Sequence, residues 1–338
     1  MDLSSSPLTK KPRAKKRKHK IDKYVESITD TFQDETIKEV NHVKTLSIAL
    51  PGSILDNAQS RTLKAFLAGQ IARAAVLFEV NEIVIYNDSD IPFQDSDAHS
   101  FGSHQCHSVA SMGIFLQYLE CPQFIREILF PKHPDLRAAQ ELNCVKLEHM
   151  KEVIAESRFC EGIISKRLGP PGKSYAKISK HSSDVLVNKK LEPGTRVTIK
   201  LEPIKPQEKF RKGQVVSPLT PLETTGEYWG YQVRLADSLT TAMSQSSFKE
   251  GYDLIIGTSE RGKDVDDVRF PDFKHALIVF GGVRGLEEAV ENDDAVTTSD
   301  PSDLFGFYIN ICPNQGSRTI RTEEAVFIAL SVLRDTFF

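Results

Sequence analysis

The pattern that most constrains the fold is a strand, a helix and a second strand within residues 45–86. Residues 45–50 and 82–86 are short apolar runs, and each is followed by a turn-forming pair. Apolar residues recur between them at spacings of three and four, which is typical of an amphipathic helix. The expected core residues of this helix are Leu63, Phe66, Leu67, Ile71, Ala74, Leu77 and Phe78. Such a unit predicts two parallel strands joined by a right-handed crossover.

Four later apolar runs predict further strands of the same sheet. They are residues 231–235, 252–256, 275–280 and 307–312. Residues 238–249 predict a short helix, and the last helix has an expected core face of Ala325, Ile328, Ala329 and Val332. Strands that alternate with helices favour a parallel sheet. We therefore expect one α/β domain in two pieces, residues 41–144, which include a helical extension, and residues 223–338.

Residues 145–222 have a different character. Short strand-like runs at 160–165, 175–178, 184–187 and 195–201 alternate with turns that contain Gly, Pro or Asn. This spacing is typical of a small barrel such as an OB-fold. Four prolines between residues 203 and 221 predict a linker that closes the insertion. The expected fold class is thus an α/β parallel sheet split by a small β-barrel.

Charge is distributed unevenly, although the net charge is only −3. Residues 10–20 hold eight Lys or Arg and no acidic residue, and residues 146–212 hold 16 Lys or Arg against eight acidic residues. Two basic segments in an otherwise acidic chain predict a polyanionic partner, and RNA is the one we expect. We expect residues 1–40 to be a largely disordered tail. Its basic run favours an address to the nucleus or nucleolus, and a solvated tail that aids solubility is the alternative.

The sequence also argues against several kinds of site. No apolar run approaches the ~20 residues that cross a bilayer, so no membrane partner is expected. Five dispersed cysteines indicate reduced thiols. A cluster of possible metal ligands (His99, His104, Cys106, His107) has no second group to complete a zinc site, so we expect no metal. Residues 167–174 end like a P-loop, but Arg167 replaces the first glycine, which favours a barrel loop.

Three of the later strands run into turns rich in glycine and hydroxyl side chains. These turns span residues 257–262, 281–285 and 312–319. In a parallel sheet all three meet at the carboxyl edge, where ligands bind, and glycine lets backbone groups approach a ligand closely. The third turn leads into the last helix, for which Thr322 is the expected N-cap. Three such turns on consecutive strands predict one binding site.

This arrangement resembles the knotted half of the SPOUT (α/β-knot) superfamily of RNA methyltransferases. The resemblance rests on Gly281-Gly282-Val283-Arg284-Gly285, on Asn314-Gln315-Gly316-Ser317-Arg318-Thr319, and on Gly69-Gln70-Ile71-Ala72-Arg73-Ala74-Ala75, which is similar to the first motif of that family. It covers nearly all of residues 44–335 and is greatest to a eukaryotic and archaeal branch with an inserted β-barrel. The resemblance implies a trefoil-knotted parallel sheet split by an OB-like barrel.

The resemblance further implies S-adenosylmethionine as the cofactor and a homodimer as the assembly. The residues it implies for cofactor binding are Thr258, Arg261, Gly281, Gly282, Gly285, Asn310, Cys312, Asn314, Gln315, Gly316, Ser317 and Thr319. Arg73 is the candidate catalytic residue, orienting a phosphate or stabilising the acceptor, because a guanidinium cannot act as a base at neutral pH. Arg284 is a further candidate for the cofactor carboxylate, and Glu260 is one candidate for the base.

Two functions remain open on the sequence alone. In the first, the chain is an RNA methyltransferase acting on ribosomal RNA, with the barrel and tail holding the RNA and with Phe159, Tyr175 and Phe210 available for stacking. In the second, a SPOUT-fold protein has lost catalysis and binds RNA in ribosome assembly or another nuclear complex. The intact turns favour the enzyme, whereas the missing base favours the binding protein.

Overall fold

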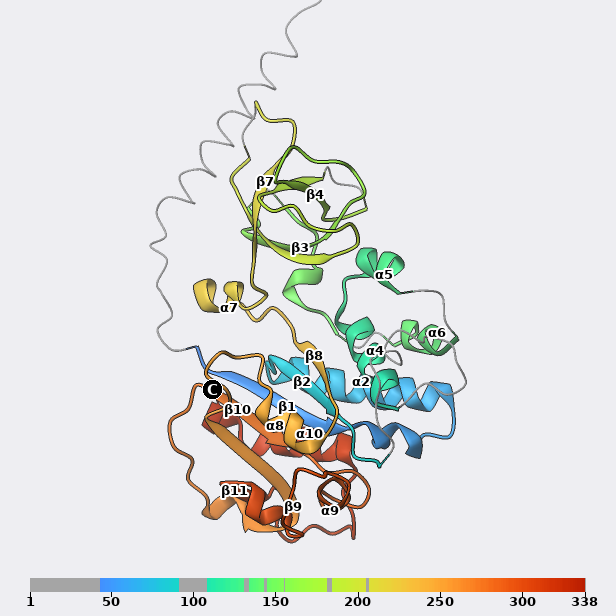
Figure 1. Cartoon of the computed structure of the whole chain (residues 1–338), viewed down its shortest axis with the longest axis vertical. Coiled ribbons are helices and arrows are strands. Elements are labelled where there is room, and N and C mark those ends of the chain that lie inside the picture. Colours follow the sequence, from blue (N-terminus) through green and yellow to red (C-terminus); the bar gives the residue numbers. More distant parts are fainter. Residues whose placement is uncertain are drawn as a thin grey trace, which may run out of the picture. The chain divides into compact units, whose positions relative to one another are not determined.

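The computed structural model describes residues 43–90, 108–130, 134–142, 145–154, 156–180, 184–204 and 207–337. These residues divide into a barrel unit within Lys151–Thr220 and an α/β unit formed by the rest (Figure 1). The predicted tail, residues 1–40, lies outside the described residues, and so does the cluster of His99, His104, Cys106 and His107.

The α/β unit contains a six-stranded sheet in which every pair of neighbouring strands is parallel. Its order is β11-β9-β10-β1-β2-β8. The bounds are β1 (Thr45–Pro51), β2 (Glu82–Tyr86), β8 (Gln232–Ala236), β9 (Leu254–Asp264), β10 (His275–Val279) and β11 (Phe307–Asn310). The strands β1 and β2 are buried along their whole length, as expected of strands covered on both faces. The predicted parallel α/β sheet is confirmed.

Helices cover both faces of this sheet (Figure 1). Side chains such as Ile48, Ile83 and Ile278 pack in one cluster with residues of α2, α4, α6 and α10, whereas Ala49 and Val84 pack in another with residues of α8 and α9. The bounds are α2 (Arg61–Leu77), α4 (Ser108–Glu120), α5 (Gln123–Leu129), α6 (Pro134–Gln140), α7 (Thr220–Thr225), α8 (Leu239–Ser244), α9 (Glu287–Glu291), α10 (Thr322–Val332) and α11 (Arg334–Phe337). Short 3-10 turns occupy Gly52–Asn57, Glu148–Met150, Val265–Asp267 and Pro301–Leu304.

The predicted core faces of two helices are wrong in part. On α2, Leu63, Phe66 and Leu77 are each more than half exposed, and on α10 Val332 is 47% exposed while Val326 and Leu330 are buried. Both helices carry apolar residues around more of their circumference than one sheet face can cover. Spacing alone therefore could not identify which stripe faces inward. The predicted helix over residues 238–249 is also shorter, since it ends at Ser244.

The barrel unit is a closed five-stranded barrel in the order β3-β4-β5-β7-β6. Its strands are β3 (Phe159–Ile164), β4 (Ser174–Lys177), β5 (Val185–Val187), β6 (Arg196–Leu201) and β7 (Lys212–Val216). The sequence predicts four of them but assigns β7 to the linker, because Lys212, Gly213 and Gln214 give that strand no apolar alternation. The segment at residues 167–174 joins β3 to β4 and precedes no helix, as expected of a barrel loop.

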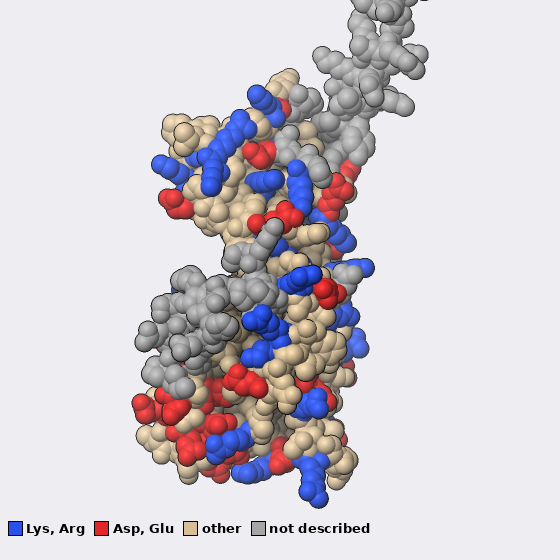
Figure 2. Space-filling view, turned by 90° about the vertical axis from the view of Figure 1, so that its right-hand side faces the viewer, with Lys and Arg blue, Asp and Glu red and all other residues tan. Residues whose placement is uncertain are grey.

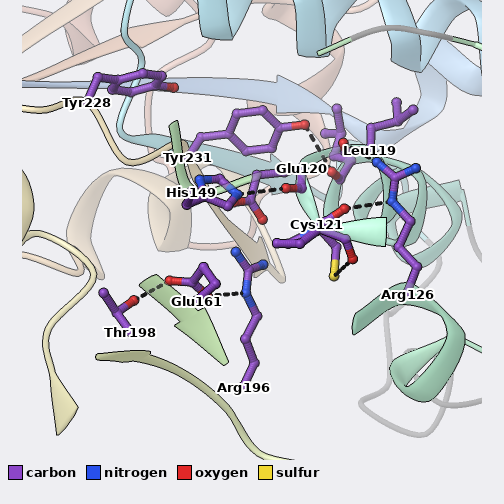
Figure 3. A network of polar contacts seen from close by, with 12 residues as sticks. Leu119, Glu120, Cys121, Arg126, His149, Glu161, Arg196, Thr198, Tyr228 and Tyr231 are labelled. Atoms are coloured by element: carbon purple, nitrogen blue, oxygen red, sulfur yellow. Dashed lines mark hydrogen bonds and ion pairs between the residues drawn. The ribbon is translucent and has the colours of Figure 1, made fainter. Parts of the chain in front are cut away.

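Each unit contains a buried carboxylate held by a basic side chain (Figure 3). In the α/β unit, His149 Nε2 lies 3.0 Å from Glu120 Oε1, and both side chains are almost fully buried. In the barrel unit, Arg196 Nε donates to Glu161 over 2.7 Å, and Thr198 Oγ1 donates to the same carboxylate over 2.5 Å. A charge this deeply buried needs such partners to offset its lost hydration. We therefore assign these two carboxylates a structural role in their units.

Candidate functional site

A cavity of about 310 Å³ lies at the carboxyl ends of β9, β10 and β11. This volume is at the lower end of the range typical of small-molecule sites. Its walls are Thr258, Ser259, Glu260, Arg261, Phe280, Gly281, Gly282, Val283, Arg284, Gly285, Glu287, Asn310, Ile311, Gln315, Arg318, Thr319, Ile320, Thr322 and Ala325. All three predicted turns therefore contribute to one cavity, which we call the edge pocket.

The first turn is built differently from the prediction. Strand β9 does not end at Ile256 but continues to Asp264. Its ladder with β11 skips from Gly257 to Lys263, while the partner residues on β11 are consecutive. The intervening residues thus leave the ladder at the carboxyl edge of the sheet, and Thr258, Ser259, Glu260 and Arg261 face the edge pocket.

The turn at residues 281–285 requires glycine at two positions. Gly285 has φ = +79°, a conformation that other residues rarely adopt. A Cβ added at Gly281 would lie 2.4 Å from the backbone carbon of Gly285 and 2.6 Å from the nitrogen of Leu286. The backbone is therefore packed against itself here, and this packing sets one wall of the edge pocket.

Side-chain hydrogen bonds tie the pocket segments together. Thr258 Oγ1 donates to the carbonyl of Val279 over 3.0 Å, and Asn310 Nδ2 donates to the carbonyl of Glu260 over 3.2 Å. Thr322 Oγ1 donates to the carbonyl of Gly281 over 2.9 Å. The predicted N-cap role of Thr322 is thus wrong: it is the first residue of α10, and its hydroxyl fastens that helix to the glycine turn.

The last loop contributes fewer residues to the pocket than predicted. Gln315 and Thr319 line it, but Cys312, Asn314, Gly316 and Ser317 are not among its described walls. Cys312 packs against the main core instead. The polar groups of the loop partly bond to each other, since Ser317 Oγ donates to the carbonyl of Thr319 over 2.8 Å and Gln315 Nε2 donates to that of Ser317 over 3.0 Å. Several polar side chains of the loop therefore stabilise its own conformation.

Charged side chains surround the rim of the edge pocket. Arg261 pairs with Glu287 over 2.9 Å and Arg284 with Glu288 over 3.3 Å. The positive charge of each predicted arginine is therefore already balanced by a glutamate. Arg318 is exposed, lines the pocket and makes no ion pair with any described residue. Arg318 is therefore the better placed cation for an anionic ligand group, and the sequence analysis did not single it out.

Asp88, a buried carboxylate that sequence reasoning did not identify, lies close to Gly282. Asp88, at the carboxyl end of β2, is 4% exposed and accepts hydrogen bonds from the backbone N–H and the hydroxyl of Ser53. Burial raises the pKa of Asp88 above its ordinary value, and the hydrogen bonds from Ser53 oppose this shift. A Cβ added at Gly282 would lie 3.2 Å from Ser53 Oγ and 3.3 Å from Asp88 Oδ2. This pair thus supports the glycine turn from beneath.

Arg73 does not belong to the described lining of the edge pocket. It is exposed and lies toward the C-terminal end of α2. A neighbouring cavity of about 560 Å³ is lined by Leu63, Phe66 and Gln70 of α2 and by Gly282 and Thr319 of the pocket turns. Residues 63, 66, 70, 73 and 77 follow one another at spacings of three and four, so Arg73 shares its helix face with this second cavity.

The pocket residues that sequence reasoning missed come from all three turns and from the entry to α10. They are Ser259, Phe280, Val283, Glu287, Ile311, Arg318, Ile320, Thr322 and Ala325. The polar run before the last helix was a signal for Arg318, which stands inside it. The apolar members gave no signal, because a pocket wall and a core position look alike in a sequence.

Neither a metal site nor a membrane span is found in the parts of the chain that the structure describes. No group of three or more His, Cys, Asp or Glu side chains there is placed to hold a metal ion. No described helix is long and apolar enough to cross a bilayer. A site lined by backbone turns, carboxylates and an unpaired guanidinium suits an organic cofactor with charged groups.

Comparisons with known proteins assign this fold and site to a class. A model of the family described as "Putative RNA methyltransferase" matches residues 45–333. The chain belongs to this family, and it is an RNA methyltransferase.

Individual relatives are similar over most of the chain. The 28S rRNA (uridine-N(3))-methyltransferase of Drosophila melanogaster is 43% identical over 96% of this chain and 70% of its own length. The protein of the same name from Homo sapiens is 46% identical over 86% of this chain and 78% of its own. A solved structure of a "putative methyltransferase", Lpg2936 from Legionella pneumophila with bound S-adenosylmethionine, matches at 10% identity and a TM-score of 0.34, covering 87% of this chain and 66% of that one. A likeness this remote carries no argument about the site.

Proposed function

We propose that the chain is a SPOUT methyltransferase that transfers a methyl group from S-adenosylmethionine to N3 of a uridine in ribosomal RNA. The carrying observation is the edge pocket, formed by three consecutive parallel strands in a chain that is 43% and 46% identical to 28S rRNA (uridine-N(3))-methyltransferases. The proposal includes the knotted path of the last segment. The hydrogen bond from Thr322 to the glycine turn supports this path, because it fastens the segment after β11 to the end of β10.

The residues of the edge pocket fit this cofactor in kind. The backbone of the glycine turn and the polar groups of Ser259, Gln315 and Thr319 offer donors and acceptors to an adenosine. Arg318 would hold the amino-acid carboxylate, and Glu287 its ammonium group. The cofactor, when bound, supplies the methyl group as a sulfonium, which needs no metal.

The uracil acceptor sets two further requirements. Its N3 carries a proton that must be lost on methylation, and its ring must lie in line with the donor. Glu260 lines the edge pocket and is exposed there, so a bound base can reach its carboxylate. We propose Glu260 as the proton acceptor and the pocket turns as the elements that orient the base.

The exposed face of α2 supports the proposal of a homodimer. Leu63, Phe66 and Leu77 are each more than half exposed on one stripe, with Gln70 and Arg73 between Phe66 and Leu77, and large exposed apolar side chains on one helix face favour a protein interface. Covering this stripe with a second copy would bring Arg73 into the interface, next to the cavity beside the edge pocket. Phe66→Asp should yield a monomer in analytical ultracentrifugation, whereas Leu168→Asp, at a barrel residue that is 95% exposed, should leave the assembly unchanged. A Phe66→Asp dimer would contradict the proposal.

The basic segments suit the proposed substrate. Lys and Arg side chains are frequent on the barrel surface, in the upper part of Figure 2. Together with the basic run at residues 10–20, they would attract the RNA backbone. The same run would direct the chain to the nucleus and nucleolus, where ribosomal RNA is made.

One pair of measurements tests the proposed function. Calorimetry should detect binding of S-adenosylmethionine to the full chain, and tritiated cofactor should then label 28S ribosomal RNA at a uridine. Glu260→Gln should keep cofactor binding and lose most of the transfer. Cofactor binding without transfer to any RNA would overturn the enzymatic proposal in favour of an RNA-binding protein, and absence of cofactor binding would overturn the pocket assignment.

A further inference from the structure

One face of the barrel carries aromatic rings that do not belong to its core. Tyr175 on β4 is only 8% exposed, yet it is not part of the cluster of buried side chains that fills the barrel. It is covered instead by two neighbours on the outer surface. The ring of Phe210 meets it edge-on at 5.1 Å between centroids, and the guanidinium of Arg167 lies 4.2 Å from its centroid.

These three side chains come from separate segments of the barrel. Arg167 belongs to the loop between β3 and β4, Tyr175 to β4, and Phe210 to the loop between β6 and β7. The strand order, with β5 parallel to β7, is that of an OB-fold whose five strands are β3 to β7 in sequence. In OB-folds the second and third strands and the loops between strands 1 and 2 and between strands 4 and 5 bind oligonucleotides. The ring cluster occupies that face.

The described parts of both loops are held in place by contacts that do not involve their exposed side chains. In the first, a Cβ at Gly169 would lie 2.5 Å from the carbonyl oxygen of Lys173, so the loop is tightly folded. In the second, Arg211 donates to the carbonyls of Glu202 and Ser157 over 2.8 and 2.9 Å. Phe210, the adjacent residue, is therefore fixed before any ligand arrives, which lowers the entropy cost of binding.

The charge of this face matches a polyanion. Lys166, Lys173 and Lys209 lie within two residues of Arg167, Tyr175 and Phe210 in the chain, are exposed, and make no ion pair with any described residue. Lys209 Nζ lies 5.7 Å from the centroid of Phe210. Arg167 itself is 47% exposed, and its one acidic neighbour, Asp184, lies 3.9 Å away. The central guanidinium carbon of Arg167 lies 4.2 Å from the centroid of Tyr175 and 4.6 Å from that of Phe210, so the charged group contacts both rings while about half of the side chain stays exposed.

We infer that this face binds a single-stranded segment of the RNA substrate, with one base stacked on the exposed guanidinium of Arg167 and phosphates beside Lys166, Lys173 and Lys209. The inference rests on the proposed function for the identity of the ligand as RNA. Bases stack on arginine planes and on rings, and this stacking tolerates any sequence. Tyr175 and Phe210 act by supporting the guanidinium. The face therefore grips unpaired RNA without reading its sequence, and the methylated nucleotide is selected in the α/β unit.

Two ring variants of the full chain test the inference without removing any charge. Binding of a fluorescein-labelled, single-stranded RNA of twelve nucleotides is followed by anisotropy. Tyr175→Leu and Phe210→Leu should each weaken binding about five- to tenfold, because the guanidinium of Arg167 loses a ring that holds it in position for stacking. Tyr175→Phe keeps the ring and should bind as the unchanged chain does. Lys200→Ala removes one charge from the outward side of β6, a strand that carries none of the three side chains, and should change affinity less than about twofold.

The outcomes separate this inference from the proposed function. Ring variants that bind within twofold of the unchanged chain would overturn it, and so would equally tight binding of a duplex of the same sequence. Phe210→Leu guards against misfolding, because Phe210 lies on a loop outside the core, and thermal unfolding checks both variants. If the unchanged chain methylates ribosomal RNA while the ring variants bind normally, only the inference fails. If the ring variants lose RNA affinity and no methyl group is ever transferred, only the proposed enzyme fails.

Discussion

The edge pocket and the barrel face that carries Arg167, Tyr175 and Phe210, which we call the ring face, both bear many polar groups. The two surfaces are built in opposite ways. In the edge pocket, hydroxyl and amide side chains bond to neighbouring backbone carbonyls, and two of the arginines pair with glutamates. On the ring face, the lysines extend into solvent and the guanidinium stacks on rings. Polar groups in the first surface therefore hold a shape, whereas those in the second remain available to a ligand.

Because of this difference, we expect the two surfaces to respond differently to substitutions. A pocket whose walls are tied to each other should fail as a unit when one tie is removed. A face made of independent charges and stacked rings should lose affinity gradually. Substitutions in the two regions should therefore differ in the size of their effect and in which affinity they change, that for the cofactor or that for RNA.

The largest effect is expected at Gly281. Gly281→Val places two further carbons beyond a Cβ that already lies 2.4 Å from the Gly285 backbone, so the turn must move. We expect S-adenosylmethionine affinity to fall at least about 100-fold, equal to ~2.8 kcal/mol, in calorimetry. Gly316→Ala is the matched control, because nothing lies within 4 Å of its added Cβ. Equal affinities of the two variants would show that the glycine turn is not a wall of the cofactor site.

A smaller loss is expected at Thr322. Thr322→Val keeps the shape of the side chain but removes the hydroxyl that donates to the carbonyl of Gly281. This hydrogen bond is partly buried, so the acceptor left without its donor should cost about 1 kcal/mol or somewhat more, and we expect a roughly tenfold loss of cofactor affinity. Thr322→Ser should restore binding. Failure of the serine to do so would mean that the methyl group, and not the hydrogen bond, matters here.

Thr322 also illustrates how far the sequence could predict this molecule. Its position before the last helix predicted an N-cap, since threonine is favoured there. The actual bond reaches 41 residues back to the glycine turn, a contact that depends on the path of the chain. The parallel strands, by contrast, followed from short apolar runs such as residues 82–86, which match the observed β2. Local patterns thus predicted elements, while long-range partners had to be observed.

The same limit explains the errors on α2 and β7. Leu63 and Phe66 fit the helical spacing but lie outside the face that packs on the sheet, because spacing does not report which stripe is covered. Strand β7 forms because β5 and β6 both pair with it, although Lys212 and Gly213 have little strand preference of their own. The candidate site was predicted at the level of its turns, and Arg318 and Asp88 required the structure.

On the ring face, each single substitution should cause only a small loss of RNA affinity. Lys173→Ala and Lys209→Ala each remove one exposed charge, so each should weaken single-stranded RNA binding about two- to threefold at moderate salt. The slope of log affinity against log salt should become shallower by about 0.7 per lysine. Cofactor affinity should not change. A loss of cofactor binding in either variant would break the contrast between the two regions.

The fourth prediction is a dependence of stability on pH at Asp88. Because burial raises its pKa, the folded chain binds this proton more tightly than the unfolded chain does. The contribution of Asp88 to stability therefore falls as pH rises from its ordinary pKa through the raised one. Asp88→Asn does not titrate, so its Tm relative to the unchanged chain should increase as pH rises from the ordinary pKa of an aspartate toward neutrality. A constant difference in Tm across that interval would show that burial does not govern this carboxyl.

The smallest effect is expected at Arg261, which the resemblance assigned to the cofactor. Its side chain is 72% exposed and pairs with Glu287, and exposed pairs contribute only about 0–1 kcal/mol. Arg261→Ala should therefore change both Tm and cofactor affinity little, with Arg318→Ala as the contrasting variant that weakens binding. If Arg261→Ala gives the larger loss, the guanidinium must leave Glu287 when the cofactor arrives. The rim of the edge pocket would then resemble the ring face, because its charges would be available to a ligand. The contrast between the two surfaces would apply only to the hydrogen bonds that Thr258 and Thr322 donate to backbone carbonyls.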